Sequence, residues 1–327
     1  MSEFSDKEIS IAPMMDRTDR HCRYFHRLLA PDIRLYTEMV VAHAVIRGDR
    51  DRLLAFDPAE SPLALQLGGS EPGLLAEAVR VASPYGYDEF NLNIGCPSDR
   101  VQSGSFGACL MAEPETVAAS VRAMRAATDL PVTVKTRIGI DDHDSYDFLA
   151  EFVRQISDAG CSKFVVHARK AILSGLSPKE NRSIPPLIYD RVYQLKKDFP
   201  NLIIILNGGV RTTAEVRGHL EHVDGVMIGR QAYSNPYWLT DLQQLLTDDK
   251  SGKPVPDREE IVASMADYAH RHVSAGTRMH HISRHMLGLY SGQPGARNWR
   301  RTVSEGCSDT AAGPEVLLDS LTNLSPI

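Results

Sequence analysis

The sequence predicts an α/β fold: a parallel (β/α)8 TIM barrel followed by a small all-helical C-terminal domain. Eight short apolar runs rich in Val, Ile and Leu recur along the chain, and segments with helical spacing lie between most of them. Eight such units in roughly 240 residues match the usual size of this barrel, about 250 residues. After residue 236 the alternation stops and helical spacing alone continues, which predicts the second domain.

The predicted strands and helices alternate in chain order. The strands cover residues 9–13, 35–39, 63–67, 89–94, 132–136, 164–167, 202–206 and 226–228. The helices cover residues 72–82, 114–128, 146–159, 189–198 and 213–220, often with Pro or Asp near the start and Gly or Asn near the end. A doubly wound sheet is the alternative, but no G-x-G-x-x-G motif follows the first strand.

A domain boundary is expected between residues 245 and 246. A polar, proline-containing loop over residues 248–256 precedes a long helical stretch at 258–274. We therefore expect a catalytic barrel domain over residues 1–245 and a helical domain over residues 246–327. The tail at 307–327 matches no pattern that indicates a role.

Bulk composition excludes several classes of protein. With 43% hydrophobic and 24% charged residues, the chain is neither disordered nor fibrous. No apolar run reaches the ~18 residues that cross a bilayer and no secretory signal is evident, so we expect a cytoplasmic protein without membrane contact. Five sparse cysteines argue against a disulfide framework or zinc ribbon. His281 and His285, four apart, lack a companion carboxylate or thiolate cluster, so no metal site is expected.

Charge is segregated along the chain although the net charge is only −6. The stretch from Tyr268 to Ser304 contains no Asp or Glu, and it holds six arginines and five histidines. These are Arg271, Arg278, Arg284, Arg297, Arg300 and Arg301, with His270, His272, His280, His281 and His285. Removing the six arginines from the 36 basic residues leaves 30 against 42 acidic residues elsewhere. A one-signed segment on an acidic protein indicates a nucleic-acid contact.

Polar or soft residues end most of the predicted strands, and in a barrel of this kind the chemistry lies at those ends. Each residue alone has a structural explanation, but several at one rim indicate a site. They are Pro13, Met14 and Met15 at the close of strand one, Gln66 in strand three, Asn93 and Cys96 at strand four, Lys135 and Arg137 at strand five, and His167 and Arg169 at strand six. Cys96 follows Asn93 by three residues, where it is placed to donate a proton.

Glycine-bearing turns follow the last two strands and indicate a phosphate-bearing ligand. Asn207, Gly208 and Gly209 follow strand seven, and Gly229 and Arg230 follow strand eight. Such turns free backbone N–H groups where barrels bind phosphate, and an arginine adds a permanent positive charge.

The rim chemistry favours FMN as that ligand. Lys135 can stabilise the anionic N1–C2=O edge of a reduced flavin, Gln66 can hydrogen-bond its pyrimidine ring, and His167 can lie nearby. A sugar phosphate, or pyridoxal phosphate on Lys135, is the alternative. Pyridoxal phosphate would leave Cys96 without a role.

Two motifs resemble those of the tRNA-dihydrouridine synthases, flavoenzymes that reduce uridine in tRNA. The first is Asn-x-Asn-x-Gly-Cys-Pro at 91–97 with Val-Gln-x-Gly-x-Phe-Gly-Ala-Cys-Leu-Met at 101–111. The second, Ala-Arg-Lys at 168–170 followed by Gly-Leu-Ser-Pro-Lys-Glu-Asn-Arg at 175–182, resembles the A-type, 20/20a, branch of that family. The resemblance covers residues 11–301.

The resemblance implies roles for individual residues. Cys96, rather than Cys109, would be the proton donor. FMN would be held by Pro13, Met14, Met15, Gln66, Lys135, His167, Asn207, Gly208, Gly209, Gly229 and Arg230, and tRNA by Asn93, Lys179, Arg182, Arg297 and Arg300. The implied reaction is reduction of FMN by NADPH (or NADH), hydride transfer from flavin N5 to uracil C6, and protonation of C5 by Cys96. A thiol suits this task because it is largely protonated at neutral pH.

Two other functions are weighed against this one. A flavin oxidoreductase acting on a free pyrimidine or another small enone would leave the arginines unused. A non-catalytic tRNA-binding or folding module would not need the thiol. Neither the sequence nor the resemblance indicates an obligate protein partner.

Overall fold

The computed structural model describes residues 4–98, 101–102, 104–247, 255–322 and 324. They form two compact units. The helical unit contains the described parts of Met1–Ser5, Asp16–Ile33 and Gly229–Ile327, and the barrel unit contains Asp6–Met15 and the described part of Arg34–Ile228. Residues 248–254 of the expected linker lie outside the described residues. The boundary expected between residues 245 and 246 stays a prediction, because compactness does not show which part folds or functions alone.

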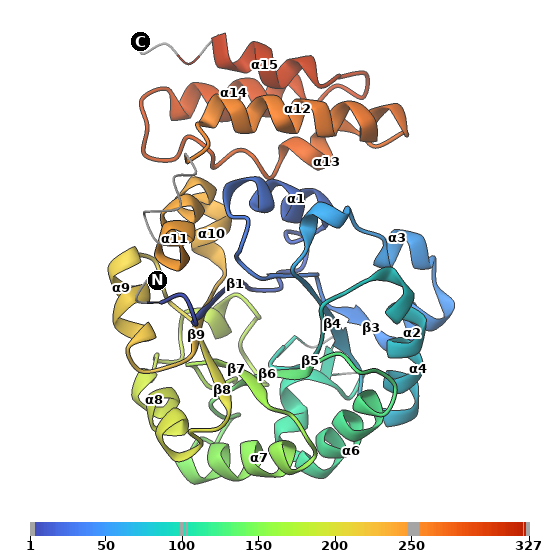
Figure 1. Cartoon of the computed structure of the whole chain (residues 1–327), viewed down its shortest axis with the longest axis vertical. Coiled ribbons are helices and arrows are strands. Elements are labelled where there is room, and N and C mark those ends of the chain that lie inside the picture. Colours follow the sequence, from blue (N-terminus) through green and yellow to red (C-terminus); the bar gives the residue numbers. More distant parts are fainter. Residues whose placement is uncertain (1–3, 99–100, 103, 248–254, 323, 325–327) are drawn as a thin grey trace. The chain divides into compact units, whose positions relative to one another are not determined.

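Eight parallel strands form a nearly closed barrel, which confirms the predicted fold class (Figure 1). The strands are β1 (Glu8–Ile11), β2 (Leu35–Tyr36), β4 (Leu63–Gly68), β5 (Glu89–Ile94), β6 (Val132–Arg137), β7 (Lys163–His167), β8 (Ile203–Asn207) and β9 (Gly225–Ile228). A short β3 (Val40–Val41) pairs with the end of β4. Their order is β1-β9-β8-β7-β6-β5-β4-β2. Arg34 N–H to Ile9 O (3.0 Å) and Ile11 N–H to Arg34 O (2.9 Å) link β1 to the start of β2.

Helices surround this barrel, as its strand-helix alternation requires (Figure 1). They are α2 (Ala42–Arg47), α3 (Arg50–Leu54), α4 (Pro72–Ala82), α6 (Pro114–Arg125), α7 (Tyr146–Asp158), α8 (Tyr189–Asp198) and α9 (Thr213–Leu220), with 3-10 turns η1 (Pro58–Glu60), η2 (Ser83–Tyr85), η3 (Gly107–Ala112) and η4 (Glu180–Arg182). Local signals explain their starts: α4 and α6 begin with proline, and Ser145 caps α7 by accepting from Phe148 N–H. The expected bounds of α4, α8 and α9 are confirmed.

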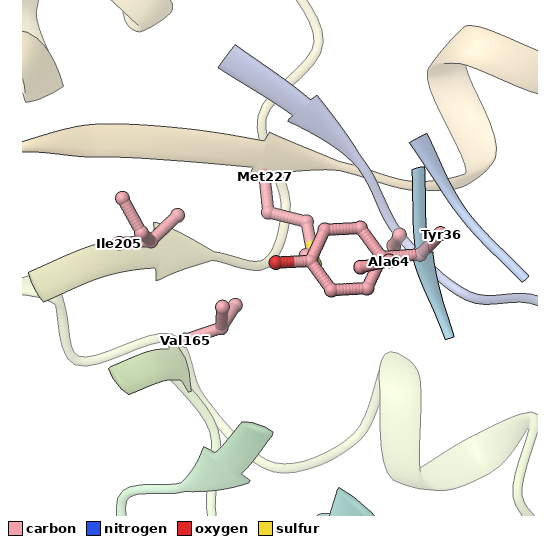
Figure 2. Close-up of a cluster of buried hydrophobic side chains, with 6 residues drawn as sticks. Tyr36, Ala64, Val165, Ile205 and Met227 are labelled. Carbon is pink, nitrogen blue, oxygen red and sulfur yellow. The ribbon is translucent and has the colours of Figure 1, made fainter. Parts of the chain in front are cut away.

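The middle of the barrel interior is apolar. The ring of Tyr36 reaches inward from β2 and packs among small and aliphatic side chains from the other strands (Figure 2). These are Ala12, Ala64, Val165, Ile205 and Met227, all buried. Because alternate residues of each strand point inward, β2, β4, β7, β8 and β9 each contribute one side chain to this layer, and Ala12 joins it from just after β1. The barrel is therefore a packed core and not a pore.

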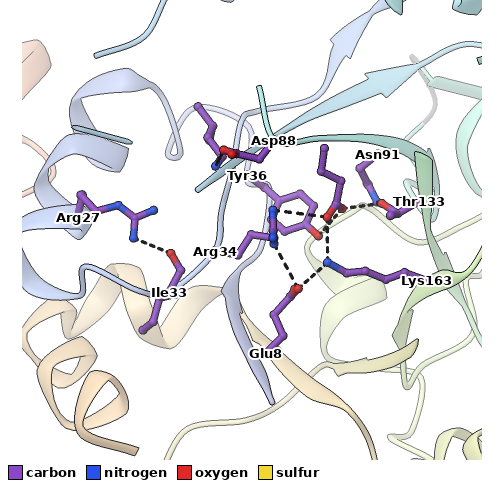
Figure 3. Close-up of polar contacts among 11 residues, drawn as sticks. Glu8, Arg27, Ile33, Arg34, Tyr36, Asp88, Asn91, Thr133 and Lys163 are labelled. Atoms are coloured by element: carbon purple, nitrogen blue, oxygen red, sulfur yellow. Dashed lines mark hydrogen bonds and ion pairs between the residues drawn. The ribbon is translucent and has the colours of Figure 1, made fainter. Parts of the chain in front are cut away.

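Below this layer, near the amino ends of the strands, four charged groups pair with one another. Lys163 Nζ lies 2.6 Å from Glu8 Oε2 and 2.9 Å from Glu89 Oε2, and Figure 3 shows it reaching Glu8. Arg34 lies 3.2 Å from Glu8 and 3.7 Å from Glu89. Burial alone would raise the pKa of Glu89, but Lys163 and Arg34 hold that pKa below its usual value. Glu89 is therefore an ionised carboxylate inside the barrel.

Over its described residues, the helical unit combines one early helix with seven later elements. They are α1 (Arg20–Leu29), α10 (Arg230–Ser234), η5 (Pro236–Trp238), α11 (Leu239–Leu246), α12 (Arg258–Ser274), α13 (Met279–Ser283), α14 (Ala296–Gly306) and α15 (Glu315–Thr322). Asp19 caps α1 and pairs with Arg284 (2.6 Å) and His285 (3.0 Å). Trp299 of α14 is fully buried and donates to Met286 O (2.9 Å). No helix among the described residues is long and apolar enough to span a bilayer.

The tail, whose role the sequence leaves open, contributes to the core of the helical unit. Its helix α15 packs against α12 and α14, and Leu317 is fully buried. A side chain at Gly306 would meet Val316 at 2.6 Å, so α14 and the start of α15 lie in close contact. The tail is structural over this stretch.

We expect Lys163→Met to lower the free energy of unfolding by about 3–5 kcal/mol, because it removes the nearer of the two cations that Glu8 and Glu89 share and leaves these buried or partly buried carboxylates with Arg34 alone. Urea denaturation monitored by circular dichroism measures the change. Arg154→Ala is the control, since Arg154 and Glu151 form an ion pair on the surface of α7, and its effect should stay below about 0.5 kcal/mol. Equal effects of the two variants would contradict the claim that the ion pairs of Lys163 at the amino ends of the strands, here called the barrel floor, stabilise the fold.

Candidate active site at the carboxyl ends of the strands

Five predicted site residues lie in the upper part of the barrel interior or at its rim. They are Gln66 on β4, Asn93 on β5, Lys135 on β6, His167 on β7 and Asn207 on β8. The register sets Asn93 opposite Lys135, and His167 opposite Asn207. Asn93 Nδ2 donates to Gln66 Oε1 at 2.8 Å. The structure thus places all five where parallel strands end together.

Cys96 lies in the turn that follows β5. Asn93 Oδ1 accepts hydrogen bonds from the N–H groups of Gly95 (3.1 Å) and Cys96 (3.0 Å), and Cys96 O accepts from Ala108 N–H (2.9 Å). The Cys96 thiol is partly exposed and lies 3.6 Å from Ser98 Oγ. These bonds hold the backbone on both sides of Cys96, a partly exposed residue whose thiol donates to Ser98 Oγ.

The structure gives Asn93 a task that the sequence did not suggest. Its carbonyl oxygen already accepts two backbone bonds, and its amide nitrogen donates to Gln66. Asn93 is also almost fully buried. Its side chain therefore shapes the turn that presents Cys96, and its contact with tRNA stays a prediction.

The amine of Lys135 is held by a neutral partner. Its Nζ donates to Asn207 Oδ1 at 3.1 Å, while Asn207 Nδ2 donates to Met227 O at 2.7 Å. Burial and, second, the charge of Arg137 lower the pKa of Lys135 from 10.5 to about 7. Among the described residues no carboxylate pairs with it. An anion bound at the rim would stabilise its charged form.

Arg137 braces the turn of Cys96 from the next strand. Its Nε donates to Gly95 O (2.8 Å), and its Nη1 donates to Lys170 O (3.0 Å) and Asn181 O (3.2 Å). Burial lowers the pKa of Arg137 to about 10 although nearby Cys96 raises it. The sequence marked Arg137 as a strand-end residue but not as a site residue. Only the fold reveals that its guanidinium reaches three backbone carbonyls.

His167 and the glycine turn after β8 are close neighbours. His167 Nδ1 is buried and has no hydrogen-bond partner in the part of the chain that the structure describes. Burial, then Arg137 and Lys135, hold the pKa of His167 well below its ordinary value, so the ring is neutral at pH 7. Gly208 and Gly209 have φ of 116° and 78°, and a Cβ on Gly208 would lie 3.2 Å from His167 Nε2. Only glycine suits this turn.

The other residues expected at the cofactor lie on the segments after β1 and β9. Pro13 and Met14 are partly exposed, and Met15 is 56% exposed. Gly229 precedes α10 and Arg230 is its first residue, directly after β9 in the chain. Both belong to the helical unit. Their place at the cofactor stays a prediction.

The four basic residues expected at tRNA are all exposed. Lys179 and Arg182 lie at η4, on the loop after β7 in the barrel unit, and Arg297 and Arg300 lie on α14 in the helical unit. The two pairs thus belong to separate units.

Neither a metal centre nor a disulfide is formed by the described residues. They contain no group of three or more His, Cys, Asp or Glu side chains placed to hold a metal ion. All five cysteines are free. His285, which the sequence paired with His281, instead contacts Asp19 and, at 3.2 Å, the hydroxyl of Tyr233.

Comparison with known proteins settles the family. The model of the family described as dihydrouridine synthase (Dus) matches residues 10–324. The chain belongs to the dihydrouridine synthase family. Proteins named tRNA-dihydrouridine(20/20a) synthase are 55% identical to it in Vibrio cholerae and 57% in Vibrio parahaemolyticus, each over 97% of this chain and 96% of the relative. The protein of that name from Synechocystis sp. is 55% identical over the same shares.

A solved structure shares the fold of this dihydrouridine synthase family member. A 2-naphthoyl-CoA reductase complex aligns with a TM-score of 0.52 and 11% identity, covering 72% of this chain and 49% of that one. At this identity the likeness concerns the barrel fold alone.

We expect Lys135→Met to stabilise the cofactor-free protein. Between pH 7 and 10.5 the unfolded chain holds a proton on Lys135 that the folded chain does not, so the destabilising effect of Lys135 is full below pH 7 and fades as pH rises toward 10.5. Calorimetry at pH 6 should show Tm higher by about 2–4 °C, with a smaller gain at pH 9. Lys197→Met, at an exposed lysine of α8, should leave Tm unchanged. A lower Tm in Lys135→Met would contradict this assignment.

Proposed function

We propose that this chain reduces uridine to 5,6-dihydrouridine in the D-loop of tRNA, at positions 20/20a, with FMN as cofactor and NADPH as reductant. The family membership and the names of its near full-length relatives support the reaction and the substrate. The observation that carries the proposal is the rim itself, where the turn of Cys96 is bonded to Asn93, and Asn93 to Gln66.

The rim suits a flavin in three respects. Lys135 offers a cation without a bonded carboxylate among the described residues, which matches the anionic N1–C2=O edge of the ring. His167 Nδ1 is buried and unpartnered within the described chain, a state that a ligand hydrogen bond would relieve. Gly208 and Gly209 keep side chains away from the turn after β8, where barrels bind phosphate.

The chain's own residues then supply the proton and the geometry. When bound, FMN reduced by NADPH supplies the hydride that adds to uracil C6. Cys96 gives its thiol proton to C5, and its accessibility allows a base to reach it. Asn93 and Arg137 hold the turn so that the sulfur keeps its position during the transfer.

Recognition of tRNA is assigned to three exposed arginines and one exposed lysine. The target uridine must leave its loop to reach the rim, which costs a few kcal/mol of unstacking. Phosphate contacts by Lys179 and Arg182 on the barrel unit and Arg297 and Arg300 on the helical unit would offset that cost. The acid-free segment from Tyr268 to Ser304 adds a positive field of one sign.

We expect Cys96→Ala to slow single-turnover uridine reduction by about 10²- to 10⁴-fold while flavin stays bound, because the substrate loses its proton donor. Rapid-quench nucleoside analysis with tRNA from a strain lacking the enzyme gives the rate. Cys109→Ala is the matched control, since the Cys109 thiol donates to Phe106 O at 3.2 Å and faces a backbone carbonyl. An unchanged rate in Cys96→Ala, or equal losses in both variants, would reject the donor assignment. Equal activity on free uridine would favour a small-substrate reductase instead.

We expect Arg297→Ala and Arg300→Ala each to weaken tRNA binding and to lower its salt slope by about 0.7–0.9, because each removes one phosphate contact. Fluorescence titrations between low and physiological salt measure the slope. Arg154→Ala, at an exposed arginine paired with Glu151 on α7, should bind like the unsubstituted protein. Slopes that do not differ from this control would show that α14 makes no phosphate contact.

A further inference from the structure

A chain of buried hydrogen bonds runs through the barrel interior from its charged floor. Thr133 Oγ1 donates to Glu89 Oε1 at 2.6 Å, and Asn91 Nδ2 donates to Thr133 Oγ1 at 2.8 Å. Figure 3 shows this contact between Asn91 and Thr133, near Lys163 and Glu8. All three side chains are almost fully buried. Asn91 and Thr133 are register partners on β5 and β6 in the barrel interior, where a polar group without a partner would be costly.

The series of hydrogen bonds continues to the rim without a break. Gln66 Nε2 donates to Asn91 Oδ1 at 2.8 Å, and Asn93 Nδ2 donates to Gln66 Oε1 at 2.8 Å. Asn93 Oδ1 then accepts from the backbone N–H groups of Gly95 and Cys96. Four side chains, those of Thr133, Asn91, Gln66 and Asn93, thus form a hydrogen-bond relay from the ionised Glu89 at the floor to the turn of Cys96.

In every hydrogen bond of this relay the donor is the residue nearer the rim end of the relay. The groups at its two ends explain this common direction. Glu89 is bonded to Lys163 and, as a carboxylate, can only accept, so the Thr133 hydroxyl must donate to it. That hydroxyl then offers its lone pair to the Asn91 amide nitrogen. Asn91 consequently presents its oxygen to Gln66. At the other end, two backbone N–H groups require an acceptor, which fixes the Asn93 oxygen toward them.

We propose that Thr133 and Asn91 are positioning residues, which hold the Gln66 amide in one orientation and keep the Asn93 carbonyl on the Cys96 turn. The proposal rests on the proposed function, in which Gln66 contacts the flavin ring and Cys96 donates the proton. The reversed orientation would set N–H groups of Asn93 against those of Gly95 and Cys96 and would deprive Glu89 of a donor. The relay makes one arrangement of the rim far more stable than the other.

Thr133 offers a matched pair of variants. Thr133→Val keeps the branched shape but lacks the hydroxyl, so the Asn91 amide loses its acceptor and Glu89 loses a donor. Thr133→Ser keeps the hydroxyl and removes only a methyl group. Loss of one charge-assisted bond weakens the preferred orientation by a factor of about ten or more.

The test uses the full-length protein and compares these two variants. NMR-detected hydrogen exchange of the Gly95 and Cys96 amides reports the Asn93 contact without depending on catalysis. We expect exchange about tenfold faster in Thr133→Val, with single-turnover uridine reduction slower by a similar factor. Thr133→Ser should stay within about twofold of the unsubstituted protein in both. Thr133→Ala replaces the valine variant if the latter does not fold, with the same expected result.

Two outcomes would overturn the inference. One is equal exchange at Gly95 and Cys96 in the valine and serine variants. The other is faster exchange throughout the barrel strands, which would indicate general destabilisation and not positioning. If the unsubstituted protein binds no flavin and forms no dihydrouridine, the proposed function fails, yet the exchange comparison still decides the role of Thr133.

Discussion

The ion pairs of Lys163 with Glu8 and Glu89 are the constraint on which the rest of the barrel depends. They join β7 to β1 and β5 near the amino ends of the strands, and they keep Glu89 ionised in the interior. An ionised carboxylate in that place must be given donors, and Thr133 and Tyr36 supply two of them. The floor thus stabilises the fold and also sets the direction of the hydrogen bonds that reach the rim.

Most of the fold could be predicted because buried strands and amphipathic helices alternate with clear breaks. The prediction of the second strand was only partly correct. The run at 35–39 forms β2 over Leu35–Tyr36 only, and the chain pairs again as β3 over Val40–Val41. Helix α1 was not predicted. Its sequence carries buried basic residues, among them Arg27, whose Nη1 donates to Ala30 O (3.0 Å) and Ile33 O (2.8 Å; Figure 3). Hydropathy patterns treat such an arginine as exposed, so the burial of basic side chains on α1 hid the helix.

The candidate site was predictable to the extent that it lies at strand ends. Gln66, Lys135 and His167 come together because parallel strands share one rim. The relay below them was not found, although Glu89, Asn91 and Asn93 alternate on β5 with a period of two, which is a signal for one shared face. Thr133 of β6, which bonds to both Asn91 and Glu89, is 42 to 44 residues away from them in the chain. Only the strand register therefore reveals these bonds. The roles of the exposed arginines depend on tRNA and stay predictions.

We propose that a flavin bound at this rim passes reducing equivalents to a uridine of tRNA while Cys96 supplies the proton. The most direct measurement is an anaerobic titration of the chemically reduced, flavin-loaded protein with tRNA lacking dihydrouridine, followed by absorbance. We expect the yellow oxidised flavin to return, with one dihydrouridine formed for each flavin oxidised. A protein that binds no flavin, or a reduced flavin that persists in the presence of excess tRNA, would contradict the claim.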